Sequence, residues 1–306
     1  MASLVAEAAQ LIKGAPAFVH CRDADAVAAL LANMRRDGPS KFQVIADFDY
    51  TLTRFRLDDG ERSASTHACV EQSPQLGEDF AQRTRALFNK YYPIEVSDIP
   101  EEEKIPHMIA WWTSAHKLMM EYKLHRNHLK EMVKNSRLQL RGGTEQLFAA
   151  CQSHDAPFHI FSAGLYDVIH AFLAHHNLEK LGMHVVSNMM SFDQDGFLTD
   201  FQGTLIHSLN KNSKALRDSP EWDRIKVIIL PLAPVDWDNL GDVFMCKGLA
   251  TTNCLRVGFL NDRAEERRAQ YLDTYDIVIE SDPDMSFVNE LTDWILSASS
   301  EGRKTE

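Results

Sequence analysis

Short apolar segments recur along the chain, and segments with helical periodicity separate most of them. Each apolar segment is only a few residues long and is rich in Val, Ile, Leu and Phe. The strands expected from them cover residues 42–46, 157–161, 183–187, 226–230, 255–260 and 276–280. Short apolar strands that alternate with helices are typical of a mostly parallel sheet flanked by helices on both faces. The pattern therefore predicts an α/β fold.

The region between residues 57 and 136 differs from the rest of the chain. It is rich in charged residues and helix formers, it has helical patterns at 82–90 and 105–122, and it holds no convincing strand. We therefore expect a discontinuous core, residues 1–56 and 137–306, with a helical cap, residues 57–136, inserted after the first core strand. Other expected helices cover 24–36, 166–175 and 265–271, and residues 183–203 read as a hairpin.

Composition narrows the class of protein. The chain has 306 residues and a formal net charge of −12, which argues against binding a nucleic acid polymer. Its five cysteines are scattered and never stand in a C-x-x-C spacing, so we expect reduced thiols and a cytoplasmic location. The first residues read as a short helix and not as a signal peptide, and no apolar run is long enough to cross a membrane. Because no apolar face that would need covering by a partner stands out, we expect a monomer.

Two carboxylates follow the first core strand directly. Asp47 and Asp49 lie two positions apart, and Thr51 comes two positions later. Residues at i and i+2 point the same way along an extended chain, and ligands of open α/β sheets bind beyond the carboxyl ends of the strands. An acid at such a place can bind magnesium, act as a nucleophile, or simply cap a turn, and the pair alone does not separate these readings.

A second and a third motif follow along the chain. Ser162, Ala163 and Gly164 follow an expected strand and precede a helix, where small residues let backbone N–H groups approach an anion. A plain serine helix cap gives the same pattern. Lys211 offers a cation for phosphate oxygens, with Lys214 as a nearby rival and a solvated surface lysine as the ordinary alternative.

The fourth motif holds two acids. Asp238 and Asp242 stand four apart around a glycine turn in "WDNLGDVFMCKG". Together with Asp47 they can complete an oxygen-rich magnesium site, although a turn with a helix cap is the alternative.

Taken in this order, the four motifs resemble those of the haloacid dehalogenase (HAD) superfamily of phosphatases: D-x-D-x-T, Ser-Ala-Gly, Lys and D-x-x-x-D. Further segments, among them "YYPIEV", "WWTSAHKLM" and "VVSNMMSFDQDG", look like the type III cytosolic pyrimidine 5′-nucleotidases, a family that includes the 7-methylguanosine phosphate-specific 5′-nucleotidases. The resemblance runs from about residue 19 to residue 296. It implies a HAD-like Rossmannoid core with a helical cap, and a magnesium-dependent 5′-nucleotidase that acts on CMP, UMP or 7-methyl-GMP.

The resemblance also implies roles for single residues. Asp47 would attack the phosphate and form an aspartyl-phosphate. Asp49 would act as the general acid for the leaving nucleoside and then as the base for water. Ser162, Ala163 and Lys211 would hold the phosphate, with Gly164 in support.

The magnesium ligands implied by the resemblance are Asp47, the backbone carbonyl of Asp49, and Asp238. Asp242 would be a supporting ligand, and Thr51 would brace the loop.

The nucleobase would be held by the cap. Glu95 would contact the base edge, and the helix that carries Trp111, Trp112 and Ala115 would form the wall of the pocket. Adjacent tryptophans cannot share one helix face, so we expect one to stack on the base and the other to pack into the cap, with a core position as the alternative for either. Ala115 and Trp112 depart from the serine and tyrosine expected in pyrimidine-preferring members. His67 is a weaker candidate for the rim. 7-Methylguanine carries a positive charge, which the face of a Trp attracts by about 1–2 kcal/mol. This attraction and the two departures favour 7-methyl-GMP alongside CMP and UMP.

The match to the family breaks between the fourth expected core strand and Asp238. Residues 231–237 are inserted there, with two prolines, and Trp237 stands where the family has glycine. Asp236 is a rival metal ligand, although Asp238 keeps the D-x-x-G-D spacing. Two alternatives to hydrolysis therefore stay open: a catalytically impaired HAD-fold protein that only binds nucleotide, and a phosphotransferase in which a nucleoside replaces water as acceptor.

Overall fold

The computed structural model describes residues 2–97, 99–211, 227–230 and 253–297. Lys214 and the fourth motif, which includes Asp236, Asp238 and Asp242, lie outside the described residues, as does the insertion at 231–237. Within the described ranges, no helix is both long enough and apolar enough to cross a membrane.

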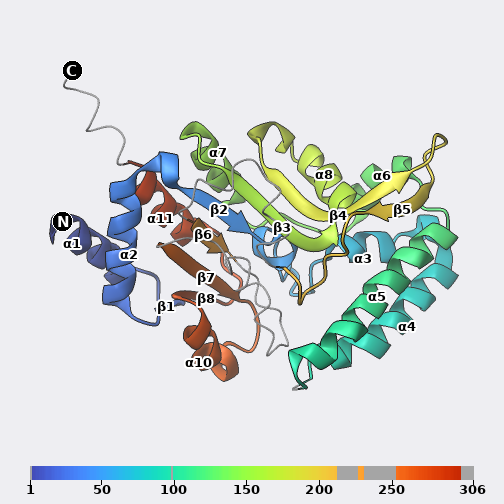
Figure 1. The fold of residues 1–306 in the computed structure, drawn as a ribbon, viewed down its shortest axis with the longest axis horizontal. Coiled ribbons are helices and arrows are strands. Elements are labelled where there is room, and N and C mark those ends of the chain that lie inside the picture. Colours follow the sequence, from blue (N-terminus) through green and yellow to red (C-terminus); the bar gives the residue numbers. More distant parts are fainter. Residues whose placement is uncertain (1, 98, 212–226, 231–252, 298–306) are drawn as a thin grey trace.

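One sheet runs through the middle of the molecule (Figure 1). The described strands form it in the order β1-β8-β7-β6-β2-β3-β4-β5. All neighbours from β8 to β4 pair in parallel, whereas β1 and β5 are antiparallel at the two edges. The strands are β1 Val19–Cys21, β2 Gln43–Ala46, β3 Phe158–Leu165, β4 His184–Phe192, β5 Leu198–Gln202, β6 Val227–Leu230, β7 Cys254–Leu260 and β8 Ile277–Glu280. The predicted α/β fold with a mostly parallel sheet is confirmed.

Helices cover both faces of the sheet. Side chains alternate between the faces of a strand, and β7 and β8 send apolar side chains to both faces. Val257, Phe259 and Ile279 join the large cluster that includes α2 and α11, whereas Leu260 and Val278 pack with α10. The helices are α1 Ala2–Lys13, α2 Ala24–Asp37, α3 Thr66–Glu71, α4 Gly77–Glu95, α5 Glu101–Glu121, α6 Leu129–Asn135, α7 Thr144–Ser153, α8 Tyr166–His175, α10 Ala264–Thr274 and α11 Ser286–Leu296.

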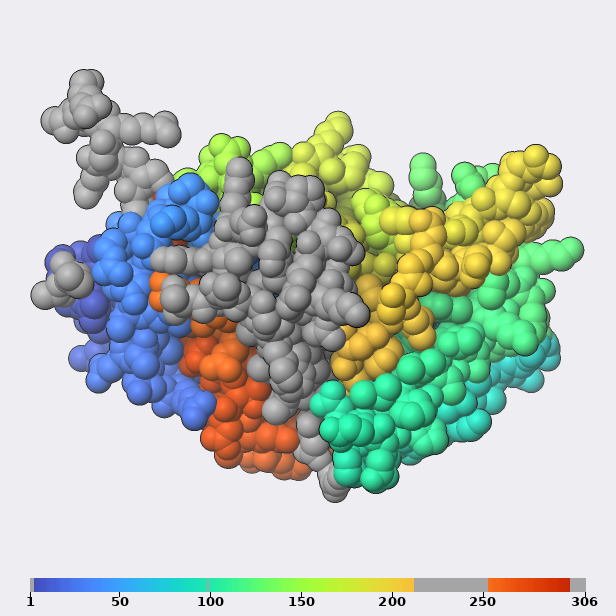
Figure 2. Space-filling view, viewed as in Figure 1, coloured from blue at the N-terminus to red at the C-terminus, as the bar shows by residue number. Residues whose placement is uncertain are grey.

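The segment between β2 and α7 carries helices α3 to α6 and, in its described residues, no strand. Its two long helices, α4 and α5, lie side by side at the end of the molecule far from α1 (Figure 1). In the space-filling view this pair borders the hairpin of β4 and β5 (Figure 2). Both helices begin several residues before the predicted starts, because acidic side chains in their first turns favour the helix dipole.

Two local predictions need correction. The strand expected at 157–161 does not end there, because β3 continues through Ser162, Ala163 and Gly164 to Leu165, and α8 starts only at Tyr166. Pairing with β4 is interrupted by a bulge after Phe161 and resumes at Leu165, which lies opposite Asn188, so the strand continues past the site residues. The short antiparallel edge strand β1 was not predicted at all, since three residues carry too little pattern.

Candidate active site

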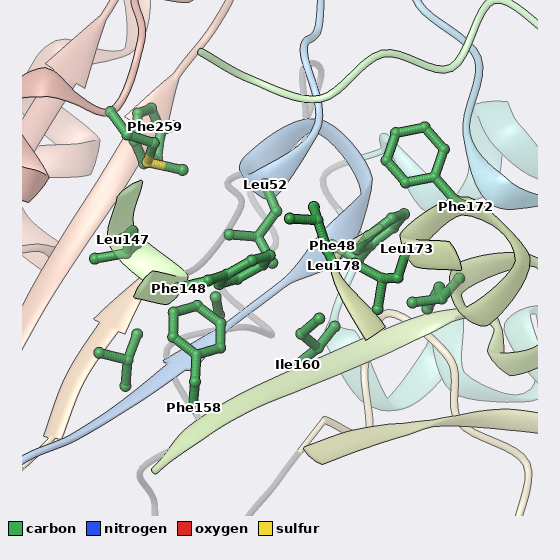
Figure 3. Close-up of a cluster of buried hydrophobic side chains, with 14 of the residues drawn as sticks. Phe48, Leu52, Leu147, Phe148, Phe158, Ile160, Phe172, Leu173, Leu178 and Phe259 are labelled. Carbon is green, nitrogen blue, oxygen red and sulfur yellow. The ribbon is translucent and has the colours of Figure 1, made fainter. Parts of the chain in front are cut away.

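The loop after β2 is one wide turn, η2, Phe48–Leu52, which the bond from the Thr53 N–H to the Phe48 carbonyl closes at 3.1 Å. Its two ends are anchored in the core: the side chains of Phe48 and Leu52 are fully buried and point into the cluster that holds Phe148 and Phe172 (Figure 3). Tyr50 adopts a left-handed conformation, with φ of 65°, which costs free energy for a residue other than glycine. The turn therefore needs outside support to present Asp47 and Asp49.

Part of that support comes from Thr53. Its hydroxyl accepts a hydrogen bond from the Tyr50 N–H at 2.7 Å and donates one to the Phe48 carbonyl at 3.2 Å. The Thr51 hydroxyl, which was expected to brace the loop, has no hydrogen-bond partner among the described residues.

Asp47 lies at the tip of β2 and forms a buried ion pair. The Lys211 ammonium donates to Asp47 Oδ1 at 2.6 Å, and both side chains are almost fully buried. Burial raises the pKa of Asp47 above its ordinary value, and the charge of Lys211 opposes that rise. The structure thus brings together two predicted site residues that lie far apart along the chain.

Asp49 is held by the start of α3. Its Oδ1 accepts from the Thr66 N–H and its Oδ2 from the Thr66 hydroxyl, each at 2.8 Å. Burial, and secondarily the charge of Asp47, raise the pKa of Asp49 to about 7. Thr66 was not predicted as a site residue, although Ser65 before it is a good helix-capping signal and does cap α3.

The end of β3 passes close to this pair of acids. The Ser162 hydroxyl accepts from the Gly164 N–H at 3.0 Å. A Cβ at Gly164 would lie 2.2 Å from the Thr66 hydroxyl and 3.0 Å from Asp49 Oδ2, so only glycine fits there. Ser162, Ala163 and Gly164 line the same cavity as Asp47 and Asp49.

Glu95 lies at the end of α4, 8% exposed, and accepts a hydrogen bond from the Ser208 hydroxyl at 2.8 Å. Burial raises the pKa of Glu95 to about 8, against weaker opposing effects of Ser208, Lys104 and Arg62. Glu95 is therefore mostly protonated and uncharged at neutral pH. It attracts a cationic base electrostatically only in its ionised form.

Aromatic side chains of α4 and α5 surround the cavity next to Glu95. Trp111 and Trp112 both line the cavity, with ring centroids 5.1 Å apart, whereas only one of them was expected to face it. Trp111 stacks against Tyr91 at 6.1 Å, and the Trp112 indole N–H donates to the Ala163 carbonyl at 3.0 Å. Trp112 thus links α5 to the end of β3, which the sequence did not indicate.

Two weaker candidates also lie on this cavity. Ala115 is buried on α5, and His67 is half-buried on α3, with its ring 6.1 Å from that of Trp112. Burial lowers the pKa of His67 to about 4, so it is neutral at physiological pH.

One continuous cavity of about 790 Å³ joins these groups. The acids, Ser162 and Lys211 line it together with Glu95 and the two tryptophans. Its lining also includes residues that sequence reasoning missed, and these come from η2, the segment that follows it, α3 and α4: Tyr50, Arg62, Glu71, Arg85, Phe88 and Tyr92. The volume lies within the usual range for small-molecule sites.

Only some of the oxygen ligands expected for a metal ion lie among the described residues. Among the described residues, no three His, Cys, Asp or Glu side chains come together as a metal site. Asp47 offers a buried carboxylate and Asp49 a backbone carbonyl, while Thr66 holds the Asp49 side chain in place. Such oxygen donors suit Mg²⁺, and the third expected ligand, Asp238, lies outside the described residues.

Comparisons with known proteins agree with this geometry. A sequence profile of the family described as pyrimidine 5′-nucleotidase (UMPH-1) matches residues 50–296. A 7-methylguanosine phosphate-specific 5′-nucleotidase of Rattus norvegicus is 37% identical over 284 residues, which span 92% of this chain and 93% of the relative.

Solved structures agree as well. The crystal structure of cytosolic 5′-nucleotidase IIIB bound to cytidine is similar with a TM-score of 0.81 and 30% identity, and the match covers 92% of this chain and 94% of that one. A HAD family hydrolase from Salmonella enterica serovar Typhi, 14% identical, shares the fold alone, with a TM-score of 0.55 over 87% of this chain and 74% of its own. These matches confirm the expected HAD-like fold.

Proposed function

Because this chain belongs to the pyrimidine 5′-nucleotidase (UMPH-1) family of hydrolases, we propose that it is a magnesium-dependent enzyme that hydrolyses CMP, UMP and/or 7-methyl-GMP to nucleoside and phosphate. One observation carries the proposal: a single cavity connects the acids at the tip of β2 with the aromatic side chains of α4 and α5. A nucleoside monophosphate matches this arrangement, because it has an anionic phosphate at one end and a flat base at the other.

Asp47 is the proposed nucleophile. An Asp47 oxygen attacks the phosphorus atom, the bond from phosphorus to the ribose O5′ breaks, and an aspartyl-phosphate forms. The 2.6 Å bond from Lys211 keeps Asp47 oriented and favours its ionised form, and the same ammonium can neutralise phosphate oxygens. Ser162 and the backbone around Ala163 line the cavity beside this pair and hold the phosphate.

Asp49 is the proposed acid and base. It gives its proton to the departing O5′, and it then takes a proton from the water that attacks the aspartyl-phosphate and releases phosphate from Asp47. The two bonds from Thr66 fix its orientation, and a pKa of about 7 makes both protonation states accessible at neutral pH.

Magnesium, when bound, would neutralise charge on the phosphate. Asp47, the Asp49 carbonyl and Asp238 are the proposed ligands, with Asp242 in support.

Glu95, Trp111 and Trp112 are the proposed contacts for the base, with Ala115 on the same wall. A protonated Glu95 can donate one hydrogen bond and accept another, which matches the N3 acceptor and the amino donor of cytosine. The cation of 7-methylguanine would favour the ionised form and the face of a tryptophan. These proposed contacts support a division in which residues 57–136 form a cap over a core of residues 1–56 and 137–306.

The decisive experiment measures phosphate release from CMP, UMP, 7-methyl-GMP, GMP and AMP, with magnesium and then with a chelator. We expect magnesium-dependent release from one or more of the first three substrates and little from GMP or AMP. A folded sample that binds nucleotide but releases no phosphate would show instead an impaired enzyme. Labelled nucleotide formed from an added nucleoside, at the expense of free phosphate, would identify a phosphotransferase. The similar protein named cytosolic 5′-nucleotidase IIIB supports a cytoplasmic location, which fractionation of cells would test.

A further inference from the structure

Arg141 lies just before α7, is 1% exposed, and is not among the described residues that line the cavity. Its guanidinium has five N–H donors, and the structure supplies five acceptors for them. Three are backbone carbonyls at 2.6 Å and two are side chains: the carbonyls of Thr51, Tyr50 and Pro283, Asn261 Oδ1 at 3.2 Å and Asp282 Oδ1 at 2.8 Å. The guanidinium also lies over the ring of Phe259, 4.4 Å from its centroid.

These contacts converge on the turn that follows Asp47 and Asp49. Nε and Nη2 of Arg141 bind the carbonyls of Thr51 and Tyr50, and its backbone N–H binds the Leu52 carbonyl at 2.9 Å. Three consecutive carbonyls of η2 are thus held by one residue. This matters because Tyr50 is in a left-handed conformation, which persists only where the surroundings impose it.

Asn261 and Asp282 complete the arrangement. The Asn261 amide donates a second hydrogen bond to the Tyr50 carbonyl, at 3.0 Å. Asp282 accepts from the N–H groups of Phe55 and Arg56 at 3.1 and 2.7 Å, so the ion pair with Arg141 also fixes the segment that leaves η2.

We propose that Arg141 is a positioning residue for phosphoryl transfer: it holds η2 in the conformation that presents Asp47 and Asp49 to the phosphate. The inference rests on the proposed function. A lysine at this position keeps the charge, but its single ammonium cannot match five acceptors in a planar fork. The turn would then relax, and a misplacement of about 1 Å near reacting groups lowers the rate by about a hundredfold.

The test compares Arg141→Lys with Arg256→Lys. Arg256 makes a two-point ion pair with Asp276, at 3.1 and 2.9 Å, which binds no residue of η2. For Arg141→Lys we expect kcat per folded molecule to fall about a hundredfold. KM for CMP and the Kd for cytidine should stay within about twofold, because Glu95 and Trp112 are untouched. Arg256→Lys should lower the unfolding temperature without changing kcat.

A binding measurement separates this inference from the proposed function. Trifluoroberyllate with magnesium mimics a phosphoryl group on a carboxylate, and its binding to Arg141→Lys should weaken at least about tenfold while cytidine binding persists. That result would support positioning even if no nucleotide were turned over. Unchanged kcat and unchanged trifluoroberyllate binding in folded Arg141→Lys would overturn it. If that variant does not fold, Asn261→Leu replaces it in the test. This substitution removes one hydrogen bond to the Tyr50 carbonyl and should lower kcat. No change in kcat would refute the inference.

Discussion

Replacing Glu95 by Gln removes a titrating proton from the base end of the cavity and keeps the shape of the side chain. Glu95 is 8% exposed, and burial raises its pKa to about 8. At a pH of about 7 the protonated form therefore outnumbers the ionised form by about ten to one. The glutamine amide has the same pattern of one donor side and one acceptor side, so at this pH the variant should use CMP about as well as the wild type does.

The difference should appear as the pH rises. Between about pH 7 and about pH 9 the protonated fraction of Glu95 falls from about nine-tenths to about one-tenth. An ionised carboxylate can still accept from the cytosine amino group, but it repels the N3 lone pair. The wild-type kcat/KM for CMP should therefore fall about tenfold relative to that of Glu95→Gln, mainly through KM. Titrations of the phosphate and of other site residues affect both enzymes and cancel in the ratio.

Stability gives a second readout with a definite sign. The pKa of Glu95 in the folded protein lies above its ordinary value of 4.5, so its stabilising effect is complete below about pH 4.5 and is lost as the pH rises towards 8. Between pH 5 and pH 7 the wild type should lose about 2.5 kcal/mol of unfolding free energy that Glu95→Gln retains. Steady-state kinetics and urea unfolding, each on both proteins, measure these effects. A kcat/KM ratio that is flat or rises with pH would refute the assignment of a protonated Glu95 to the cytosine edge.

Further expectations concern the phosphate end of the cavity. Asp47→Asn should lower phosphate release at least about a thousandfold in a protein that still folds by circular dichroism, and normal turnover would remove Asp47 as the nucleophile. Gly164→Ala should lower the unfolding free energy by about 1–3 kcal/mol and also lower kcat, because its Cβ meets the Thr66 hydroxyl; denaturant unfolding with no loss would contradict that contact. Trp112→Phe removes the indole bond to the Ala163 carbonyl and should raise KM for CMP by about tenfold, whereas an unchanged KM would show that this bond does not position the site.

The sequence by itself determined the order and type of most elements. Hydrophobic periodicity is a local property, so the strands β2, β6, β7 and β8 and the helices α2, α8 and α10 were predicted within a few residues of their bounds. The same local reasoning placed Asp47 and Asp49 at the tip of a buried strand, because a run of apolar residues that stops at an acid marks where a strand leaves the core.

Only the tertiary structure decided how the site is held. Lys211 meets Asp47 across 164 residues, and Arg141 holds the Thr51 carbonyl across 90. No pattern along the chain encodes such pairs, since they depend on which strands and loops become neighbours when the sheet forms. The protonation of Glu95 follows from the same cause: its pKa is set by how completely α4, α5 and the residues around Ser208 exclude water, and burial is a property of the packed molecule and not of the residue.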